Sequence, residues 1–215
     1  MESFWHELWA EHRIGFHRDT VHPDLTTYYD RALAGGRRVL VPLCGKTLDM
    51  PHLVERGFDV VGVELVPLAV DEFHAENDLR PTVSEEGAFR VYRSKGLTIY
   101  CGDFFELSVE QVGEFDRIWD RAALVALDGE RRQRYVGHLK SLAAPSARML
   151  QSTIEYDQQV MSGPPWSVSV AELQEHYGPD AVAELYRTEC IAEATRWREM
   201  GHDTWVHSGY VIELE

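Results

Sequence analysis

Two apolar segments of this chain each end at residues that could hold a nucleotide. The first, Arg38–Val41, runs into a tight loop that contains Gly45. The second, residues 60–64, ends in Glu64. In a strand–helix–strand unit, an acid about 20 residues beyond the first turn accepts hydrogen bonds from ribose hydroxyls. The pattern therefore predicts the front half of a nucleoside-binding site, with the Glu64 carboxylate facing the ribose.

A further strand, Leu97–Cys101, also leads into polar and aromatic residues. Asp103 could accept a hydrogen bond from an exocyclic adenine amine, and Phe104 or Phe105 could flank a purine face. In the alternative interpretation, the two rings belong to the core and Asp103 caps a helix. One acid for the ribose and another for the adenine, at neighbouring strand ends, is the layout of S-adenosylmethionine sites.

The loop after the first strand argues against two other kinds of nucleotide site. A phosphate-binding loop needs a second glycine five residues before Gly45, and Leu40 stands there. A dinucleotide fingerprint needs three glycines where this loop has one. A nicotinamide oxidoreductase is therefore not expected. The loop could still offer backbone groups to a smaller polar ligand, or it could be an ordinary strand–helix connection.

Arg121 follows a strand expected over residues 115–120, on the side of the sheet where a cofactor would lie. Its guanidinium could bond an anionic group of a cofactor or substrate. It could also form a structural salt bridge with Asp120 or Asp116. Taken by itself, Arg121 favours the salt bridge.

Histidines and cysteines supply no clear metal or nucleophilic site. His12, His17 and His22 match no metal-ligand spacing, so no metal is expected. Cys44 lies in the binding loop, but no dedicated histidine partner is evident, which favours a packing role over a nucleophilic one. The chain has three widely spaced cysteines and no Cys-x-x-Cys pair, which predicts reduced thiols in a cytoplasmic protein.

Composition bounds the class of protein. A chain of 215 residues that is 44% hydrophobic predicts a single domain over residues 1–215. The 21 Lys and Arg against 36 Asp and Glu give a net charge of −15, which argues against nucleic-acid and anionic-membrane partners. No apolar run reaches membrane-spanning length, and the N-terminus lacks a signal-peptide layout. The oligomeric state is unreadable, and a monomer is the default expectation.

Helical and strand patterns alternate along the chain, which predicts an α/β, doubly wound sheet with ligands at the carboxyl ends of its strands. Residues 1–35 form an N-terminal helical cover segment in this interpretation. Helices are expected over 4–13, 24–34, 50–56, 67–77, 131–143 and 170–177. Strands are expected over 38–41, 60–64, 115–120 and 149–156, in a hairpin of 89–94 with 97–101, and in closing strands at 204–206 and 209–214.

Several short motifs occur in order nearly from one end of the chain to the other. They lie at residues 4–9, 14–17, 21–23, 41–46, 48–50, 62–64, 102–105, 119–121 and 163–165. Together they resemble the thiopurine S-methyltransferase family, in particular its bacterial members, which are also associated with selenium and tellurium methylation. The resemblance implies a class I methyltransferase fold, a seven-stranded, mainly parallel sheet with a reversed last strand, and S-adenosylmethionine as cofactor.

The same resemblance implies roles for individual positions. The cofactor contacts would be Trp9, Leu43, Glu64 and Arg121, with Asp103 and Phe104 beside the adenine. On the substrate side, Phe16 would belong to the cover, Pro164 and Trp166 to the wall, and Arg196 would be a late arginine facing the substrate, with Arg198 as second choice. The family commonly has Phe where Trp166 stands.

The implied reaction is methyl transfer to the sulfur of a small-molecule thiol or thiopurine, or to a selenium or tellurium species. Such acceptors are soft anions that need little general-base machinery, so alignment, exclusion of water and anion binding by Arg121 and Arg196 would carry the catalysis. One alternative is an O- or N-methyltransferase of the same fold with His17 or Asp19 as base. Another is a non-catalytic protein that senses the cofactor.

Overall fold

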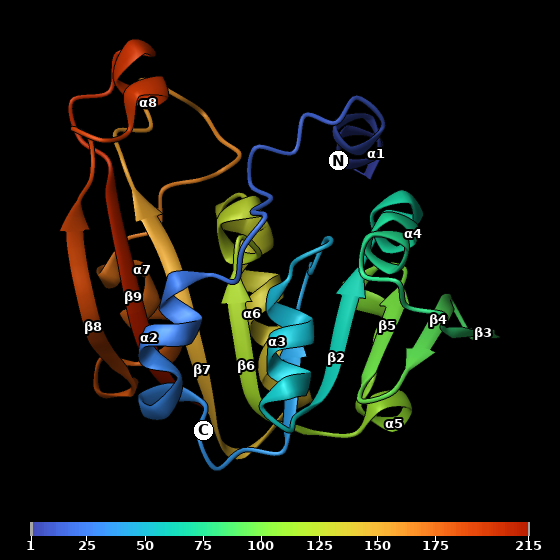
Figure 1. The fold of residues 1–215 in the computed structure, drawn as a ribbon. Helices are drawn as coiled ribbons and strands as arrows, with labels where there is room; N and C mark the ends of the chain where they lie inside the picture. The colour runs from blue at the N-terminus through green and yellow to red at the C-terminus, as the bar shows by residue number, and fades with distance from the viewer. Residues whose placement is uncertain (1, 215) are drawn as a thin grey trace.

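A mixed sheet forms the centre of the molecule. The computed structural model describes residues 2–214, and within them nine strands pair in the order β3-β4-β5-β2-β1-β6-β7-β9-β8 (Figure 1). The strands are β1 (Arg38–Val41), β2 (Asp59–Glu64), β3 (Thr82–Glu86), β4 (Phe89–Ser94), β5 (Leu97–Cys101), β6 (Phe115–Arg121), β7 (Ala143–Glu155), β8 (Val182–Glu189) and β9 (Val206–Leu214).

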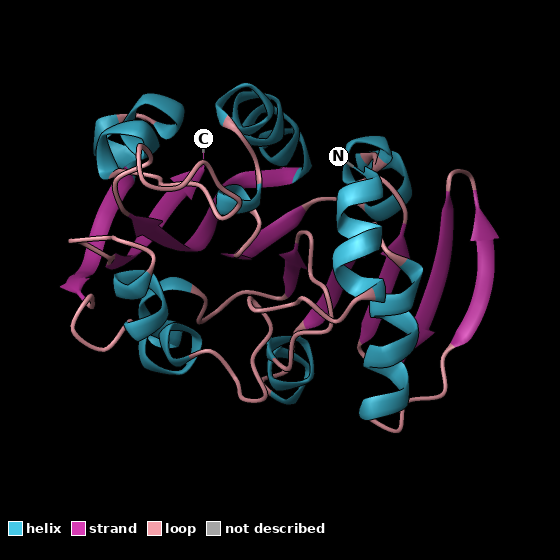
Figure 2. Ribbon diagram, turned by 90° about the horizontal axis from the view of Figure 1, so that it is seen from above, coloured by secondary structure: helices cyan, strands magenta, loops and turns pink. Residues whose placement is uncertain are grey.

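Helices cover both faces of the sheet, as the view from above shows (Figure 2). They are α1 (Glu2–Ala10), α2 (Pro23–Ala32), α3 (Asp49–Glu55), α4 (Pro67–Glu76), α5 (Val109–Val112), α6 (Gly129–Leu142), α7 (Val170–Tyr177) and α8 (Thr195–Glu199). Their starts carry ordinary signals. Asp128 and Ser169 accept backbone N–H groups at the first turns of α6 and α7, and Pro67 stands at the first position of α4.

The pairing of the strands confirms an α/β, doubly wound fold. Strands β5, β2, β1, β6 and β7 run parallel, and the last strand in the chain, β9, is antiparallel to both of its neighbours, β7 and β8. The count of seven strands was too low. Strands β3 and β4 extend the edge at β5 as an antiparallel ladder, of which only the β4–β5 hairpin was predicted.

Alternating side chains on the central strands explain why both faces are covered. Leu40 and Val61 belong to the core beneath α5, α6 and α7, whereas Val39 and Val60 belong to the core beneath α2, α3 and α4. Strands that are buried on both faces read as near-continuous apolar runs. This is why β1 and β2 were easy to predict from their sequences.

The N-terminal segment lies across the carboxyl ends of the parallel strands. Figure 1 shows α1 above α4, at the end of the sheet towards which the arrowheads of β2, β5 and β6 point. Trp9 is buried there against Val66 and Ala69, and Phe16 packs against the same small cluster. The helix ends at Ala10, three residues earlier than predicted.

The closing strands of the sheet differ from the prediction. A separate strand at 204–206 is wrong, because β9 runs from Val206 to Leu214 without a break. Its antiparallel partner is β8, which the sequence analysis missed. Most of β8 is exposed at the sheet edge, so its sequence lacks the strong apolar alternation of an inner strand.

Candidate active site

One cavity of about 1040 Å³ lies between the carboxyl ends of β1, β2, β5 and β6 and the N-terminal segment. Its position agrees with the rule that ligands bind outside the carboxyl ends of parallel strands. Among the residues that line it are nine of the predicted site residues. They are Trp9, Phe16, Leu43, Glu64, Asp103, Phe104, Arg121, Pro164 and Arg196.

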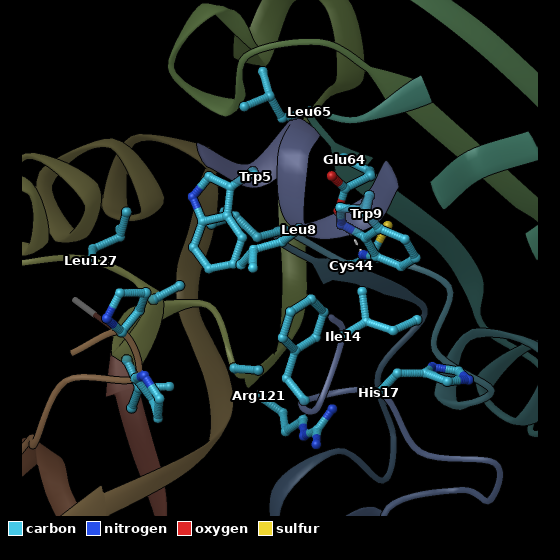
Figure 3. Close-up of a pocket in the computed structure, with 18 of the residues that line it drawn as sticks. Trp5, Leu8, Trp9, Ile14, His17, Cys44, Glu64, Leu65, Arg121 and Leu127 are labelled. Carbon is cyan, nitrogen blue, oxygen red and sulfur yellow. Dashed lines mark hydrogen bonds between the residues drawn. The ribbon is translucent and has the colours of Figure 1, made fainter. Parts of the chain in front are cut away.

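Glu64 ends β2 with its carboxylate buried at the cavity wall (Figure 3). One oxygen accepts the backbone N–H of Gly45 at 2.7 Å, and the other accepts that of Val66 at 2.8 Å. Burial raises the pKa of this carboxyl, while the hydrogen bonds from Val66 and Gly45 act in the opposite direction. Each carboxylate oxygen keeps further acceptor capacity, so Glu64 can bind donor groups of a ligand.

The loop after β1 is shaped by the residue that covers it. Gly45 has φ +54°, and a Cβ atom there would stand 3.2 Å from the Trp9 ring. Leu43 has φ +48° in the same loop, and Ala122, directly after Arg121, has φ +62°. Left-handed backbone at non-glycine residues costs of order 1–3 kcal/mol and clusters at functional sites. Both strained residues line the cavity.

Lys46 does not present a free cation to the cavity. Its Nζ lies 2.8 Å from Glu72 and 2.6 Å from Glu76, both on α4, and the side chain is buried. These ion pairs fasten the β1 loop to α4. The geometry agrees with the rejection of a phosphate-binding loop, in which this lysine would face the ligand.

Asp103 and Phe104 combine the two interpretations that the sequence left open. Asp103 lines the cavity and also accepts the N–H of Phe105 at 3.0 Å, as a cap does. Phe104 is buried against the Tyr135 and His138 rings, and it lines the cavity as well. Core packing therefore holds the aromatic wall of this end of the cavity in place.

Arg121 is not in the salt bridge that its sequence favoured. Asp120 instead accepts the Tyr135 hydroxyl at 2.7 Å, and Asp116 accepts backbone N–H groups of Arg37 and Arg38. Within residues 2–214 no ion pair to Arg121 is formed. The predicted salt bridge does not form, because both neighbouring acids accept other hydrogen bonds: Asp120 from Tyr135 on α6, and Asp116 from the backbone at the start of β1.

Burial lowers the pKa of the Arg121 guanidinium, and a more distant Asp49 acts in the opposite direction. An arginine keeps its charge in a protein even so. Asp49 itself accepts the His22 N–H at 2.7 Å and the Trp119 indole N–H at 2.8 Å. Arg121 is consequently a half-buried positive charge that lines the cavity (Figure 3), and no carboxylate within the described part of the chain is paired with it.

The late part of the chain reaches the same cavity through two segments. Pro164 belongs to a loop after β7, and Arg196 to the short helix α8. Trp166 is not among the cavity residues, because its ring packs on Gly163 while its N–H donates to the Val125 carbonyl. Arg198 also points elsewhere, to the carbonyl of Ala192. The geometry thus supports Arg196 over Arg198 and does not support Trp166.

Sequence reasoning missed several side chains at the cavity, and Arg134 and Trp197 are two of them. Arg134 on α6 places its guanidinium 4.0 Å from the centroid of the Phe105 ring. Trp197 on α8 lies beside Arg196. The spacing of Arg131 and Arg134 places them on one helix face and was a usable signal. Nothing local in the sequence marks Trp197, since its position depends on tertiary packing.

Two of the N-terminal histidines lie at the cavity. His17 is largely buried, with Nε2 3.5 Å from the Asp19 carboxylate, whereas His12 is exposed and lies 3.7 Å from Glu72. Burial lowers the pKa of His17, and the nearby charge of Lys46 lowers it further. Within the described residues, no three His, Cys, Asp or Glu side chains form a group that could hold a metal ion.

Cys44 is expected to be chemically inert in the folded protein. Burial raises the pKa of its thiol well above the ordinary value, and burial also raises the pKa of Cys101 to about 12. Only Cys190 is partly exposed. We expect a disulfide reagent at neutral pH to modify Cys190 alone and to modify all three thiols after denaturation. Rapid modification of Cys44 in the native protein would contradict this burial.

No helix among residues 2–214 has both the length and the apolar character that crossing a membrane requires.

Comparison with solved structures identifies the fold. The structure is similar to the 1,6-didemethyltoxoflavin-N1-methyltransferase of Burkholderia thailandensis, with a TM-score of 0.64 and 16% identity, covering 98% of this chain and 86% of that one. It is also similar to the N-methyltransferase NodS of Bradyrhizobium japonicum, with a TM-score of 0.58 and 12% identity, over 87% and 82% of the two chains. The fold is that of the class I methyltransferases.

Closer relatives establish the family. The thiopurine S-methyltransferase family model matches residues 1–215. The chain is 42% identical to the thiopurine S-methyltransferase of Pseudomonas aeruginosa strain UCBPP-PA14, over 98% of both proteins. It is 47% identical to that of Pseudomonas fluorescens strain Pf0-1, over 94% of this chain and 89% of that protein. The chain therefore belongs to the thiopurine S-methyltransferase family, and it is a methyltransferase.

Proposed function

We propose that the protein transfers a methyl group from S-adenosylmethionine to the sulfur of a small anionic thiol or thiopurine. The observation that carries this proposal is Arg121, a half-buried cation that lines the same cavity as Glu64 and forms no ion pair with a carboxylate of the residues that the structure describes. Selenium and tellurium anions share the same soft chemistry and are secondary candidates.

The donors and acceptors on the cofactor side suit S-adenosylmethionine. Pockets that bury a drug-sized ligand span roughly 300–1,000 Å³, so a cavity of about 1040 Å³ has room for a nucleoside and a small acceptor together. Glu64 would bind the ribose hydroxyls, and Asp103 the adenine amine. The backbone around Leu43 would receive the amino-acid end, and Trp9 would cover it. S-adenosylmethionine would supply a methyl group on a sulfonium, which a nucleophilic sulfur can accept by displacement.

The acceptor side combines an apolar wall with positive charge. Phe16 and Pro164 contribute apolar surface, and Arg121 and Arg196 contribute two cations. An acceptor with a negative charge would be held by both guanidiniums and shielded from water by the cover. Holding reactants in line at near-attack distance is worth several kcal/mol of a reaction barrier. No residue need then take a proton from an acceptor that binds already ionised.

His17 provides a test of the alternative that uses an oxygen or nitrogen acceptor. Because burial lowers its pKa from 6.5, His17 is neutral at pH 7 and could serve as a base. We expect kcat/KM with a thiol to rise with pH only until the thiol itself is ionised. His17→Gln should keep the midpoint of that rise. The measurement is the pH–rate profile of both proteins with one thiol. If kcat/KM no longer rises with pH in His17→Gln, then His17 acts as a base, which would support the alternative.

The proposal is tested by calorimetric titration with S-adenosylhomocysteine, followed in the same sample by a thiol and S-adenosylmethionine. We expect stoichiometric binding of the first and appearance of the S-methyl product from the second. Binding without turnover of any thiol would reject sulfur as the acceptor atom. Absence of binding would reject the cofactor site at Glu64 and Asp103.

A further inference from the structure

The helix that brings Arg196 to the cavity has little support of its own. Helix α8 is only five residues long, and none of its side chains is buried. So short a helix is unstable in isolation. Its place is therefore set by the tertiary contacts of its one large ring, Trp197. That ring stacks on Trp205, with ring centroids 4.0 Å apart and an angle of 9° between the planes.

Trp205 is itself held in place by burial and hydrogen bonds. Only 3% of its surface is exposed. Its backbone is bound on both sides, since its N–H donates to Glu189 at 2.9 Å and its carbonyl accepts the Cys190 N–H at 2.7 Å. Its indole N–H donates to His207 Nε2 at 2.9 Å. Trp205 thus ties α8 to the ends of β8 and β9.

The stack continues into the other wall of the cavity. Tyr156 is the second ring that stacks on Trp205, with ring centroids 5.1 Å apart and an angle of 15° between the planes. The Tyr156 hydroxyl donates to the carbonyl of Pro165 at 2.5 Å, and its backbone N–H donates to the Ser167 hydroxyl at 3.0 Å. Pro165 lines the cavity, as does Trp197 at the far end of the stack, whereas Tyr156 and Trp205 do not.

A buried histidine packs beside these rings. His202 is 2% exposed, and its ring lies edge-on to Tyr156 at 5.2 Å and to Trp205 at 5.7 Å. Its backbone N–H donates to the Trp197 carbonyl at 3.1 Å. The turn after α8 is thereby packed onto the same rings, so the ring stack holds the middle of the short helix and the turn that follows it.

We infer that Trp205 and Tyr156 are positioning residues for the acceptor half of the site. The stack Trp197–Trp205–Tyr156 sets the distance between Arg196 and the Pro164–Pro165 wall, and with it the shape of the acceptor pocket. The cofactor half is held separately, by Glu64, Gly45 and the ion pairs of Lys46. This inference rests on the proposed function, since it assigns the two late segments to the acceptor.

Substitutions in the stack should separate acceptor binding from cofactor binding. Trp205→Leu removes the flat ring, and we expect it to raise the acceptor KM about tenfold or more, because small misplacements of a binding group are costly. The dissociation constant of S-adenosylhomocysteine should stay within about twofold. Trp205→Phe, which keeps a stacking ring, should restore most of the loss. Tyr156→Phe keeps the ring and removes only the bond to Pro165, so its KM effect should be smaller.

A matched control variant lies near the opposite edge of the sheet, on β4. Tyr92 on β4 is 3% exposed and donates its hydroxyl to Asp71 at 3.1 Å, but it does not line the cavity. Tyr92→Phe should leave the acceptor KM unchanged. An equal loss of cofactor and acceptor affinity in Trp205→Leu would overturn the inference, and so would an unchanged acceptor KM in that variant.

A second readout does not depend on activity. Arg196 and Arg198 are exposed and are sites for trypsin. Loss of the stack should speed cleavage at these two bonds in native Trp205→Leu, whereas Trp205→Phe, which keeps a stacking ring, and Tyr92→Phe should stay close to the wild type. If the wild type methylates no thiol, the proposed function fails. The cleavage rates still test whether the ring stack holds α8 in place. Unchanged cleavage in Trp205→Leu, or in Trp197→Leu should the first variant not fold, would overturn the inference.

Discussion

Replacing Glu64 by glutamine is expected to weaken S-adenosylhomocysteine binding by about 100-fold, because charge-assisted hydrogen bonds contribute roughly 1.5–3 kcal/mol each. The wild-type carboxylate accepts the N–H groups of Gly45 and Val66 and keeps acceptor capacity for the ligand. The amide of glutamine offers one oxygen only, and its NH2 group must face one of these two N–H donors. The measurement is the dissociation constant by calorimetry.

Asp116→Asn is the matched control for this variant. Asp116 also accepts backbone N–H groups, those of Arg37 and Arg38, but beside the first residues of β1, and it does not line the cavity. Both variants should lose some thermal stability, whereas only Glu64→Gln should lose cofactor affinity. Wild-type affinity in a folded Glu64→Gln protein would show that this carboxylate does not hold the cofactor.

Replacing Arg121 by methionine is expected to lower kcat/KM for a negatively charged thiol by about 100-fold, which corresponds to roughly 2–3 kcal/mol of lost charge-assisted bonding. The guanidinium is half-buried and forms no ion pair with a carboxylate of residues 2–214, so its charge is available to a ligand. A neutral thiol of the same shape should lose far less. Steady-state kinetics with the two thiols give the comparison.

Two further variants sharpen this test. Arg121→Lys keeps the charge but loses the planar fork, so it should recover part of the activity. Arg196→Met should cost less than Arg121→Met, because Arg196 is exposed and its charge is screened by solvent. An equal loss for charged and neutral thiols in Arg121→Met would mean that Arg121 supports the cofactor or the fold instead of binding an anion.

The elements that the sequence predicts well are those buried on both faces. Strands β1 and β2 read as continuous apolar runs, and their polar ends had to meet because parallel strands share one carboxyl edge. Strands β3 and β8 were missed because they form the two edges of the sheet, where most side chains are exposed. Edge strands carry little of the apolar pattern on which such predictions depend.

The residues of the site also differ in how well the sequence predicts their positions. The place of Glu64 and Asp103 at the cavity could be predicted because each stands at the end of a recognisable strand. The free charge of Arg121 could not, since it depends on Asp120 and Asp116 being engaged by groups distant in the chain. For Trp166, the sequence could not show which way the ring points. Its motif is close to the cavity, yet one turn of the loop directs the ring onto Gly163.

The most direct test of the account is a competition between two anionic aromatic acceptors of the same shape, one with a thiol and one with a hydroxyl. The protein is incubated with S-adenosylmethionine and both acceptors, and the methylated products are separated by mass spectrometry. We expect the S-methyl product alone, formed at a rate that falls sharply in Arg121→Met. Methylation of the hydroxyl compound at a comparable rate, or of neither compound, would contradict sulfur transfer as the function of this site.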